Sequence, residues 1–391
     1  MTNANSLSKP NRVELVDALR GFALLGIILI HNVEHFDIAN RIISDSPVWG
    51  AVDRFVWDAV FFLFGGKCYA IFALMFGFSF YVQFENRKKR NEPFAGRFFW
   101  RMCILLLFGF FHVMFYSGEI LSCYALCGML IIPLRNLSNK VLTILMIFFA
   151  LQPYDIAQLV IGLVDPDFVP LKYDARHYFV AIEAAKESDS FFHLARLNLT
   201  QGMTAAHLFA WFGGRYLQTL ALFLAGILLG RKGLFTEEKA KGAFWKKVWI
   251  IGVLCFIPLY VFRLNFGSCG FAPSIAGPLW LLVKMWGNLA FAALLVSFFV
   301  LLWYYTRFGR IEAKLVPYGK MSMTNYICSS ILGSMIYYHY GLGLYDKAGP
   351  MISLLIGIGI FILQLLFSRW WSSRYRRGPV ETLWYKLTYL K

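Results

Sequence analysis

The sequence predicts an all-α membrane protein, a polytopic bundle of about ten transmembrane helices with both termini in the cytoplasm. The chain of 391 residues is 59% hydrophobic and only 15% charged, with a mean hydropathy of +0.58. This is too apolar for a soluble domain of this size. Apolar segments of spanning length recur along the chain, and basic residues gather on alternate connections between them. We therefore expect a single integral membrane domain over residues 1–391.

Ten apolar segments reach or approach the length needed to cross a bilayer. They are residues 13–33, 59–83, 101–117, 119–134, 141–163, 211–230, 246–265, 278–303, 322–340 and 350–371. The first five make an N-terminal half over residues 13–163, and the last five make a C-terminal half over 211–391 that ends in a cytoplasmic tail. Between the halves, residues 164–210 are polar and periodic, which predicts an amphipathic connection on the extracytoplasmic side.

Charge distribution sets the orientation of these spans. Runs of arginine and lysine follow the second, fourth, sixth, eighth and tenth segments, as in Arg87-Lys88-Lys89-Arg90, and Lys9 and Arg12 precede the first. Cytoplasmic connections carry such residues, so both termini are predicted to be cytoplasmic. The net charge of +16 lies in these short runs rather than on one solvated face, so we expect no nucleic acid partner. Seven cysteines without a CxxC pair predict neither a disulfide framework nor a metal site.

The first span carries charge at its start and an imidazole at its end. Ten residues separate Arg20 from His31, which places both on one helix face, roughly 16 Å apart along the axis. Ionisable groups inside spans are functional candidates by default. The alternatives are an arginine that reaches lipid phosphate and a histidine held by an interhelical hydrogen bond.

Other polar side chains lie within apolar surroundings. Lys67 enters the second span from the outer side, where a lysine is unexpected, so it either binds an anion or extends to the interface. Arg97 and Arg101 share a face at the cytoplasmic surface and could bind a phosphate-bearing ligand or lipid head groups. His112 lies deep in the third span and Glu119 at its outer turn, where they could act on a substrate or be packed, hydrogen-bonded residues.

Several stretches resemble the YeiB-like family of bacterial multi-pass membrane proteins, also described as domain of unknown function 418. They are DALRGFALLGI at 17–27, GKCYAIFALMFG at 66–77, RFFWRMCILLLFGFFH with GEILSCYALCGML at 97–130, YGKMSMTNYICSSILG at 318–333 and FSRWWSSRYRRGPVETLWYKLTY at 367–389. The last is the most diagnostic because it is a long ordered pattern rather than a hydrophobic run. The resemblance implies a location in the bacterial cytoplasmic (inner) membrane.

The YeiB-like family is distantly similar to transmembrane acyltransferases, including the heparan glucosaminide N-acetyltransferase group and the polysaccharide O-acyltransferases. In the latter, an arginine and a histidine ten residues apart on the first helix are associated with acyl transfer from cytoplasmic acyl-CoA. Arg20 and His31 match that spacing. The resemblance thus implies acyl-CoA as the donor.

These observations lead to two main hypotheses and leave open whether the protein is an enzyme. In the first, Arg20, Arg97 and Arg101 hold acyl-CoA phosphates, and His31 acts as general base or acyl relay toward an extracytoplasmic sugar or lipid hydroxyl. His112, Glu119 and Lys67 are further candidates for orienting His31 or stabilising an oxyanion. In the second, a transporter or lipid-handling protein uses the same buried groups as a proton or anion pathway. A membrane scaffold without chemistry is a third possibility.

Overall fold

The computed structural model describes residues 13–37, 42–171, 176–187, 190–240 and 242–389, and within these residues every regular element is helical. The longer helices are α1 Glu14–Val33, α2 Pro47–Phe64, α3 Cys68–Lys88, α4 Ala95–Val113, α5 Leu121–Leu130, α6 Asn139–Ala150, α7 Pro153–Val164, α8 Arg176–Lys186, α10 Met203–Phe212, α11 Arg215–Arg231, α13 Ala243–Leu264, α14 Pro273–Tyr305, α17 Ser322–Tyr337, α18 Pro350–Arg374 and α19 Pro379–Tyr389. Shorter helices are α9 Phe191–Leu197, α12 Glu237–Ala240, α15 Gly309–Glu312 and α16 Val316–Lys320.

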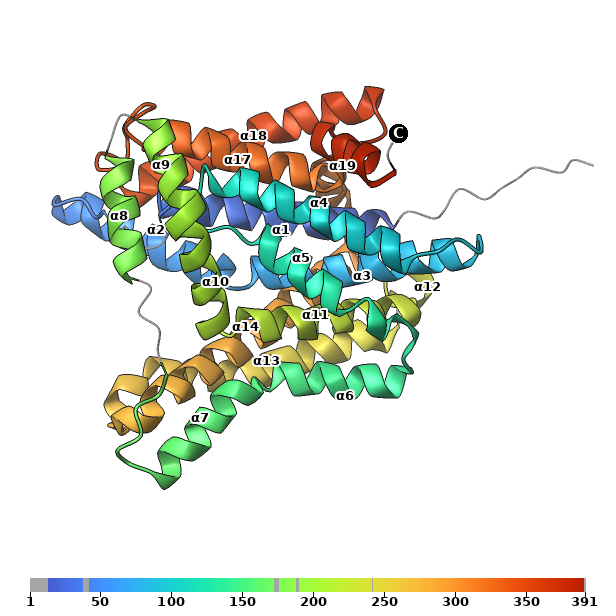
Figure 1. Cartoon of the computed structure of the whole chain (residues 1–391), viewed down its shortest axis with the longest axis horizontal. Coiled ribbons are helices and arrows are strands. Elements are labelled where there is room, and N and C mark those ends of the chain that lie inside the picture. The colour runs from blue at the N-terminus through green and yellow to red at the C-terminus, as the bar shows by residue number, and fades with distance from the viewer. Residues whose placement is uncertain (1–12, 38–41, 172–175, 188–189, 241, 390–391) are drawn as a thin grey trace, which may run out of the picture.

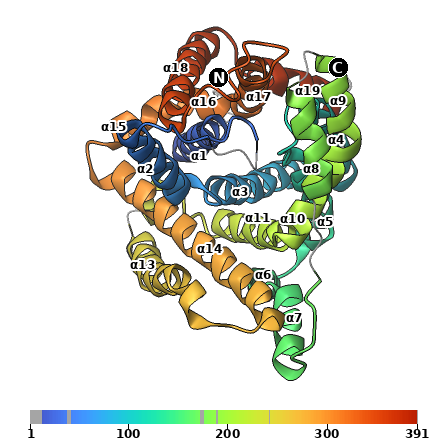
Figure 2. The ribbon, with the colours of Figure 1, turned by 90° about the vertical axis from the view of Figure 1, so that its left-hand side faces the viewer.

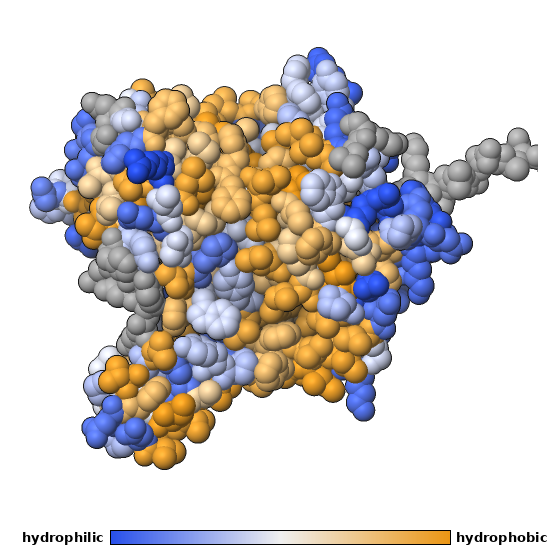
Figure 3. All heavy atoms as spheres, viewed as in Figure 1, coloured by the Kyte–Doolittle hydropathy of each residue, from blue (hydrophilic) through white to orange (hydrophobic). Residues whose placement is uncertain are grey.

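The protein is a multi-pass membrane protein, and the part of the chain that the structure describes has six helical segments long and apolar enough to cross a bilayer. They are α1, α2 with α3, α4, α13, α14 and α18. Two bent pairs, α6 with α7 and α9–α10 with α11, raise the number to eight. The segments predicted at 119–134 and 322–340 form α5 and α17, which have 10 and 16 residues. An apolar belt covers the middle of the visible face, and hydrophilic residues gather at its two ends (Figure 3).

The two ends of the bundle carry different elements. One end holds the start of α1, the connection from α3 to α4, and α19 (Figure 1). We call this the basic end, because Arg87, Arg90 and Arg97 lie there beside Tyr389 of α19. The opposite end, the cap end, is formed by α8, α9 and the connection from α17 to α18. The terminal residues 1–12 and 390–391, and residues 172–175 and 188–189 of the predicted amphipathic connection, lie outside the described residues.

Two glycines bring α3 and α11 into backbone contact at the centre of the bundle. A Cβ added at Gly77 would lie 2.1 Å from the Phe223 carbonyl oxygen, and one added at Gly226 would lie 2.2 Å from the Leu74 carbonyl oxygen. In lipid, helix association depends on such close packing because the surrounding chains are as apolar as the helices. In contrast, α13 is exposed along most of its length and packs against α14 (Figure 2).

Three of the predicted spans are interrupted rather than straight. The segment at 59–83 is divided between α2 and α3 at Gly66, whose φ is +73°. The segment at 211–230 is divided between the end of α10 and α11 at Gly214, whose φ is +67°. The segment at 141–163 bends by 49° at Gln152, whose φ is +59°. The Gln152 side-chain amide donates to the Gly214 carbonyl oxygen at 3.1 Å. Irregular backbone at membrane depth is tolerated where protein groups satisfy it, as this bond does.

Candidate functional site

A cavity of about 430 Å³ enters the bundle from the basic end, between α1, α3, α4, α5, α17 and α19. Arg20 lines it, and its guanidinium donates to Asp17 Oδ1 at 2.8 Å and to the Ser79 hydroxyl on α3. Lys320 and Arg101 add two further cations to the wall. Arg20 and Arg101, both predicted to hold donor phosphates, therefore line one cavity, together with many apolar side chains.

Glu381 of α19 is the carboxylate in this wall, and it caps the start of α17. It accepts hydrogen bonds from the backbone amides of Met323 and Thr324 at 2.8 and 3.2 Å, and from the Thr324 hydroxyl at 2.6 Å. Burial raises the pKa of Glu381, and these hydrogen bonds oppose that effect. Its charge is thus directed toward a helix N-terminus rather than toward the cations.

Arg97 lies in a second, adjoining cavity of about 180 Å³ at the surface of the basic end. Arg87, Arg90 and Arg101 also line it, and Arg101 is common to both cavities. The Arg97 guanidinium lies 5.1 Å from the Tyr389 ring centre, and Arg101 lies 3.7 Å from the Trp384 ring centre. The C-terminal helix α19 therefore positions both arginines by cation–π contact, a partnership that spacing within residues 97–101 could not reveal.

His31 lies at the other end of α1 in a group with Glu34 and Tyr116. Its Nδ1 atom is 2.8 Å from Glu34 Oε1 and 3.2 Å from the Tyr116 hydroxyl, and that hydroxyl donates to Glu34 Oε1 at 2.9 Å. The His31 side chain is 16% exposed, whereas Tyr116 is buried. A carboxylate on Nδ1 fixes the ring orientation and leaves Nε2 as the atom for proton transfer, which is the arrangement of a general base.

His112 links this group to the cavity through a row of rings. It is fully buried, its Nε2 lies 2.7 Å from the Ser330 hydroxyl of α17, and its ring stacks on Tyr326 at 4.6 Å. Its ring centre is 6.4 Å from that of Tyr116, which is 4.7 Å from that of His31. Tyr326 lines the cavity. A row of three aromatic side chains therefore runs from the cavity wall to His31, in the order Tyr326, His112 and Tyr116.

The Glu119 carboxylate is hydrogen-bonded to groups at the start of α5. Its carboxylate accepts from the backbone amides of Leu121 and Ser122 and from the Ser122 hydroxyl, which caps the first turn of α5. It does not contact His112, which pairs with α17 instead. The proposed role of Glu119 in orienting a catalytic group therefore has no direct contact to support it.

Lys67 lies away from the cavity, at the break between α2 and α3. Its amine donates to the Phe61 carbonyl oxygen at 3.3 Å and lies 5.3 Å from the Phe291 ring centre. Arg263 lines the same small recess, of about 10 Å³. This recess is too small for a cofactor phosphate, so Lys67 is separated from the arginines predicted to hold the donor phosphates. Among the described residues, no three histidine, cysteine, aspartate or glutamate side chains are grouped as metal ligands.

A second buried network lies at the cap end, next to Glu34. Lys186 of α8 and Asp37 are 1% and 2% exposed and form an ion pair at 2.7 Å, and the Tyr345 hydroxyl also donates to Asp37. His35 Nε2 lies 2.8 Å from the Ser353 hydroxyl, and burial lowers the pKa of His35 to about 4. These bonds tie residues 34–37 to α8 and α18, and so fix the surroundings of His31.

Sequence reasoning did not connect Glu34, Tyr116 or Tyr326 with His31 and His112. Glu34 follows His31 by three residues, a spacing that indicates contact on a helix, so this contact could have been predicted from the sequence. Tyr116, which follows α4, and Tyr326 of α17 reach the site from other segments of the chain, so their approach depends on how those segments fold together.

The C-terminal part of the chain, residues 229–391, matches the family model described as "Protein of unknown function (DUF418)". Three curated proteins are similar over nearly the whole chain. "Uncharacterized protein YxaH" of Bacillus subtilis (strain 168) is 26% identical, over 97% of this chain and 94% of the relative. An "Uncharacterized 39.9 kDa protein in amylase 3'region" of Bacillus acidopullulyticus is 24% identical over the same shares. "Uncharacterized protein YeiB" of Escherichia coli (strain K12) is 24% identical over 95% of both chains. These matches confirm the predicted similarity of the chain to the YeiB-like family of bacterial membrane proteins, DUF418.

Proposed function

We propose that the protein is a membrane-embedded acyltransferase that moves an acyl group from cytoplasmic acyl-CoA to an extracytoplasmic sugar or lipid hydroxyl. The observation that carries this proposal is the cavity of about 430 Å³ that starts among cations and ends at the ring row leading to His31. In the accompanying topology, ten segments cross the bacterial inner membrane, and the basic end and both termini face the cytoplasm.

The cations at the basic end suit the phosphates of the donor. Arg97, Arg101 and Arg20 follow one another from the surface recess into the cavity. Guanidinium groups bind phosphate through paired hydrogen bonds, and the apolar wall beyond them suits an acyl chain. Membrane lipids surround the same end, so lipid phosphate is the competing ligand for Arg97.

The chemistry requires one proton acceptor. The acceptor hydroxyl oxygen attacks the thioester carbonyl carbon, the C–S bond breaks, and the CoA thiolate leaves. His31 Nε2 takes the hydroxyl proton and passes it to the thiolate, while Glu34 holds Nδ1 and stabilises the imidazolium. Tyr116 and His112, which lie between the two substrates, are placed to stabilise the oxyanion or to relay the acyl group.

The first test is calorimetric binding of acetyl-CoA to the purified protein in detergent, with CoA-free buffer as the blank. Arg97→Ala with Arg101→Ala removes two cations but leaves the pair of Arg20 with buried Asp17, and Arg310→Ala, an exposed arginine outside the two cavities, is the matched control. We expect saturable binding that is lost in the double variant and kept in the control. No binding at millimolar donor contradicts the donor assignment.

The second test separates chemistry from binding. His31→Ala leaves Tyr116 to hold Glu34, so the fold and donor binding should persist while acyl transfer is abolished. Transfer that survives in His31→Ala contradicts the role of His31 as the base.

A specific observation favours transport as the second candidate. Three interrupted helices meet near α14, and Lys67, Arg215 and Arg263 lie at this level on or beside them. Interrupted helices form the binding sites of many secondary transporters, where the positive ends of half-helices face anionic substrate groups. This reading predicts anion flux into liposomes without any acyl donor, and Lys67→Gln should reduce it.

A further inference from the structure

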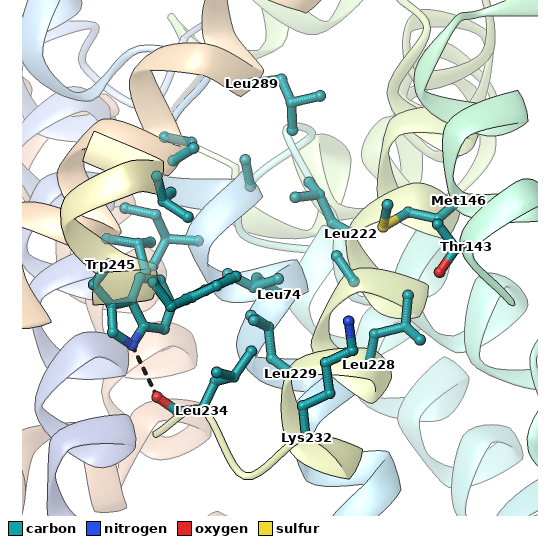
Figure 4. A pocket seen from close by; sticks show the side chains of 18 residues that line it. Leu74, Thr143, Met146, Leu222, Leu228, Leu229, Lys232, Leu234, Trp245 and Leu289 are labelled. Atoms are coloured by element: carbon teal, nitrogen blue, oxygen red, sulfur yellow. Dashed lines mark hydrogen bonds between the residues drawn. The ribbon is translucent and has the colours of Figure 1, made fainter. Parts of the chain in front are cut away.

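A second large cavity, of about 300 Å³, lies between α3, α6, α11, α13 and α14 (Figure 4). It lies where two packed pairs of helices meet, α13 with α14 and α6 with α11. It shares no lining residue with the cavity that contains Arg20. The two cavities are thus separate, although residues of α3 line both.

The wall of this cavity is almost entirely apolar. Of its eighteen lining residues, Thr143 and Lys232 carry the polar side chains besides the Trp245 indole. The Thr143 hydroxyl donates to the Asn139 carbonyl oxygen at 2.8 Å, and the indole donates to the Leu234 carbonyl oxygen at 2.8 Å. Water needs two to four polar partners to be held in a cavity, and this wall offers one amine. The occupant that suits this wall is therefore a hydrocarbon chain.

Lys232 gives the cavity one charged end. It stands at the end of α11, and in Figure 4 its side chain rises toward Leu228 and Leu222. Residues 231–247 around it contain six basic and two acidic residues. A chain that enters here would place its head group among cations at the basic end.

The size of the cavity fits one acyl chain. A methylene group is close in size to a water molecule, whose share of liquid volume is about 30 Å³, so the space accepts at least roughly ten methylenes. The neighbouring α13 has only 6% of its spanning window buried, so bilayer lipid surrounds it and is the nearest source of such chains.

We propose that this cavity binds an anionic phospholipid, with one acyl chain inserted among α6, α11, α13 and α14 and the phosphate held by Lys232. Basic sites between transmembrane helices recognise anionic head groups in this way. Chain insertion gives little selectivity because the bilayer is equally apolar, so the preference for an anionic lipid comes from the lysine.

Native mass spectrometry of the purified full-length protein tests the selectivity. Phosphatidylglycerol and phosphatidylcholine with identical chains are added in equal amounts, and the retained lipid is counted. We expect phosphatidylglycerol to be favoured, and Lys232→Gln to reduce this preference roughly fivefold, the contribution of one lysine near an anionic surface. Lys314→Gln, an exposed lysine outside the cavity, should change nothing.

A second measurement locates the chain. Phosphatidylglycerol with a brominated chain should quench tryptophan fluorescence, and Trp245→Phe should remove part of that quenching because Trp245 lines the cavity and is only 2% exposed. Ala293→Phe, which fills the cavity, should also remove it, and Ala225→Phe serves as an alternative filling variant. Equal retention of the two lipids by the unmodified protein, or quenching unaffected by both Trp245→Phe and a filling variant, would overturn the proposal.

Discussion

The ion pair between Lys186 and Asp37 offers a sharp test of how the cap end is held together. Both side chains are almost fully buried, and the amine lies 2.7 Å from the carboxylate. Burial lowers the pKa of Lys186, while Asp37 counteracts that effect. Removing one member of such a pair leaves the other charge desolvated, which typically costs about 3–5 kcal/mol.

We therefore expect Lys186→Met and Asp37→Asn each to lower the free energy of unfolding by roughly 3–5 kcal/mol, and the double variant to lower it by much less than the sum. The double variant keeps a neutral acceptor for the Tyr345 hydroxyl at position 37. A thiol-reactive dye can follow thermal unfolding in detergent, because Cys68, Cys123 and Cys127 are free and buried. Strictly additive losses would refute the reasoning, because they would mean that neither charge depends on the other.

Two further predictions concern stability. The difference between the ordinary His35 pKa of 6.5 and its folded value of about 4 corresponds to roughly 3 kcal/mol, present above pH 6.5 and lost as the pH falls toward 4, because the unfolded chain then binds the proton more readily. Thermal unfolding of His35→Gln should be less sensitive to pH over that window, and equal pH profiles would contradict this account. Gly77→Ala should lower the free energy of unfolding by about 1–3 kcal/mol, because its Cβ would meet the Phe223 carbonyl oxygen. Ala73→Gly, also on α3, is the comparison for helix propensity. An unchanged melting temperature for Gly77→Ala would contradict this prediction, because it would show that α3 and α11 can move apart without loss of stability.

Hydropathy predicted the membrane class and the placement of α1, α4, α13, α14 and α18, because a continuous apolar run has few alternatives to spanning. It did not predict the breaks. Gly65-Gly66 and Gly213-Gly214 are visible in the sequence as possible interruptions, but an apolar window averages over them. At Gln152 the sequence gives a weaker signal, the following proline, and the left-handed backbone there depends on a bond to Gly214 across the bundle.

The candidate site was predictable where partners are close in sequence or share a helix face. Arg20 and His31 lie at the depths that helix geometry requires, and Arg101 joins Arg20 at one cavity. Glu119 shows the opposite case, since its position suggested a role in orienting His31 or stabilising an oxyanion, and its carboxylate caps α5. Whether a buried acid serves a helix end or a substrate depends on the amide groups within its reach, and those become known only with the path of the chain.

Helix geometry also gives the distance along α1 between the cavity and His31, which the proposed reaction must bridge. Arg20 and Ile27 both line the cavity, and the seven-residue step from one to the other corresponds to about 10 Å along α1. His31 is four residues further, roughly 6 Å, and that remaining depth is occupied by the ring row of Tyr326, His112 and Tyr116. The row of aromatic side chains thus separates a donor bound among the arginines from His31, the proposed base. Acyl transfer in this protein therefore depends on movement of that row or on a relay through it, and His112, which has no hydrogen-bond partner for Nδ1 among the described residues, is the member of the row with an unused polar atom.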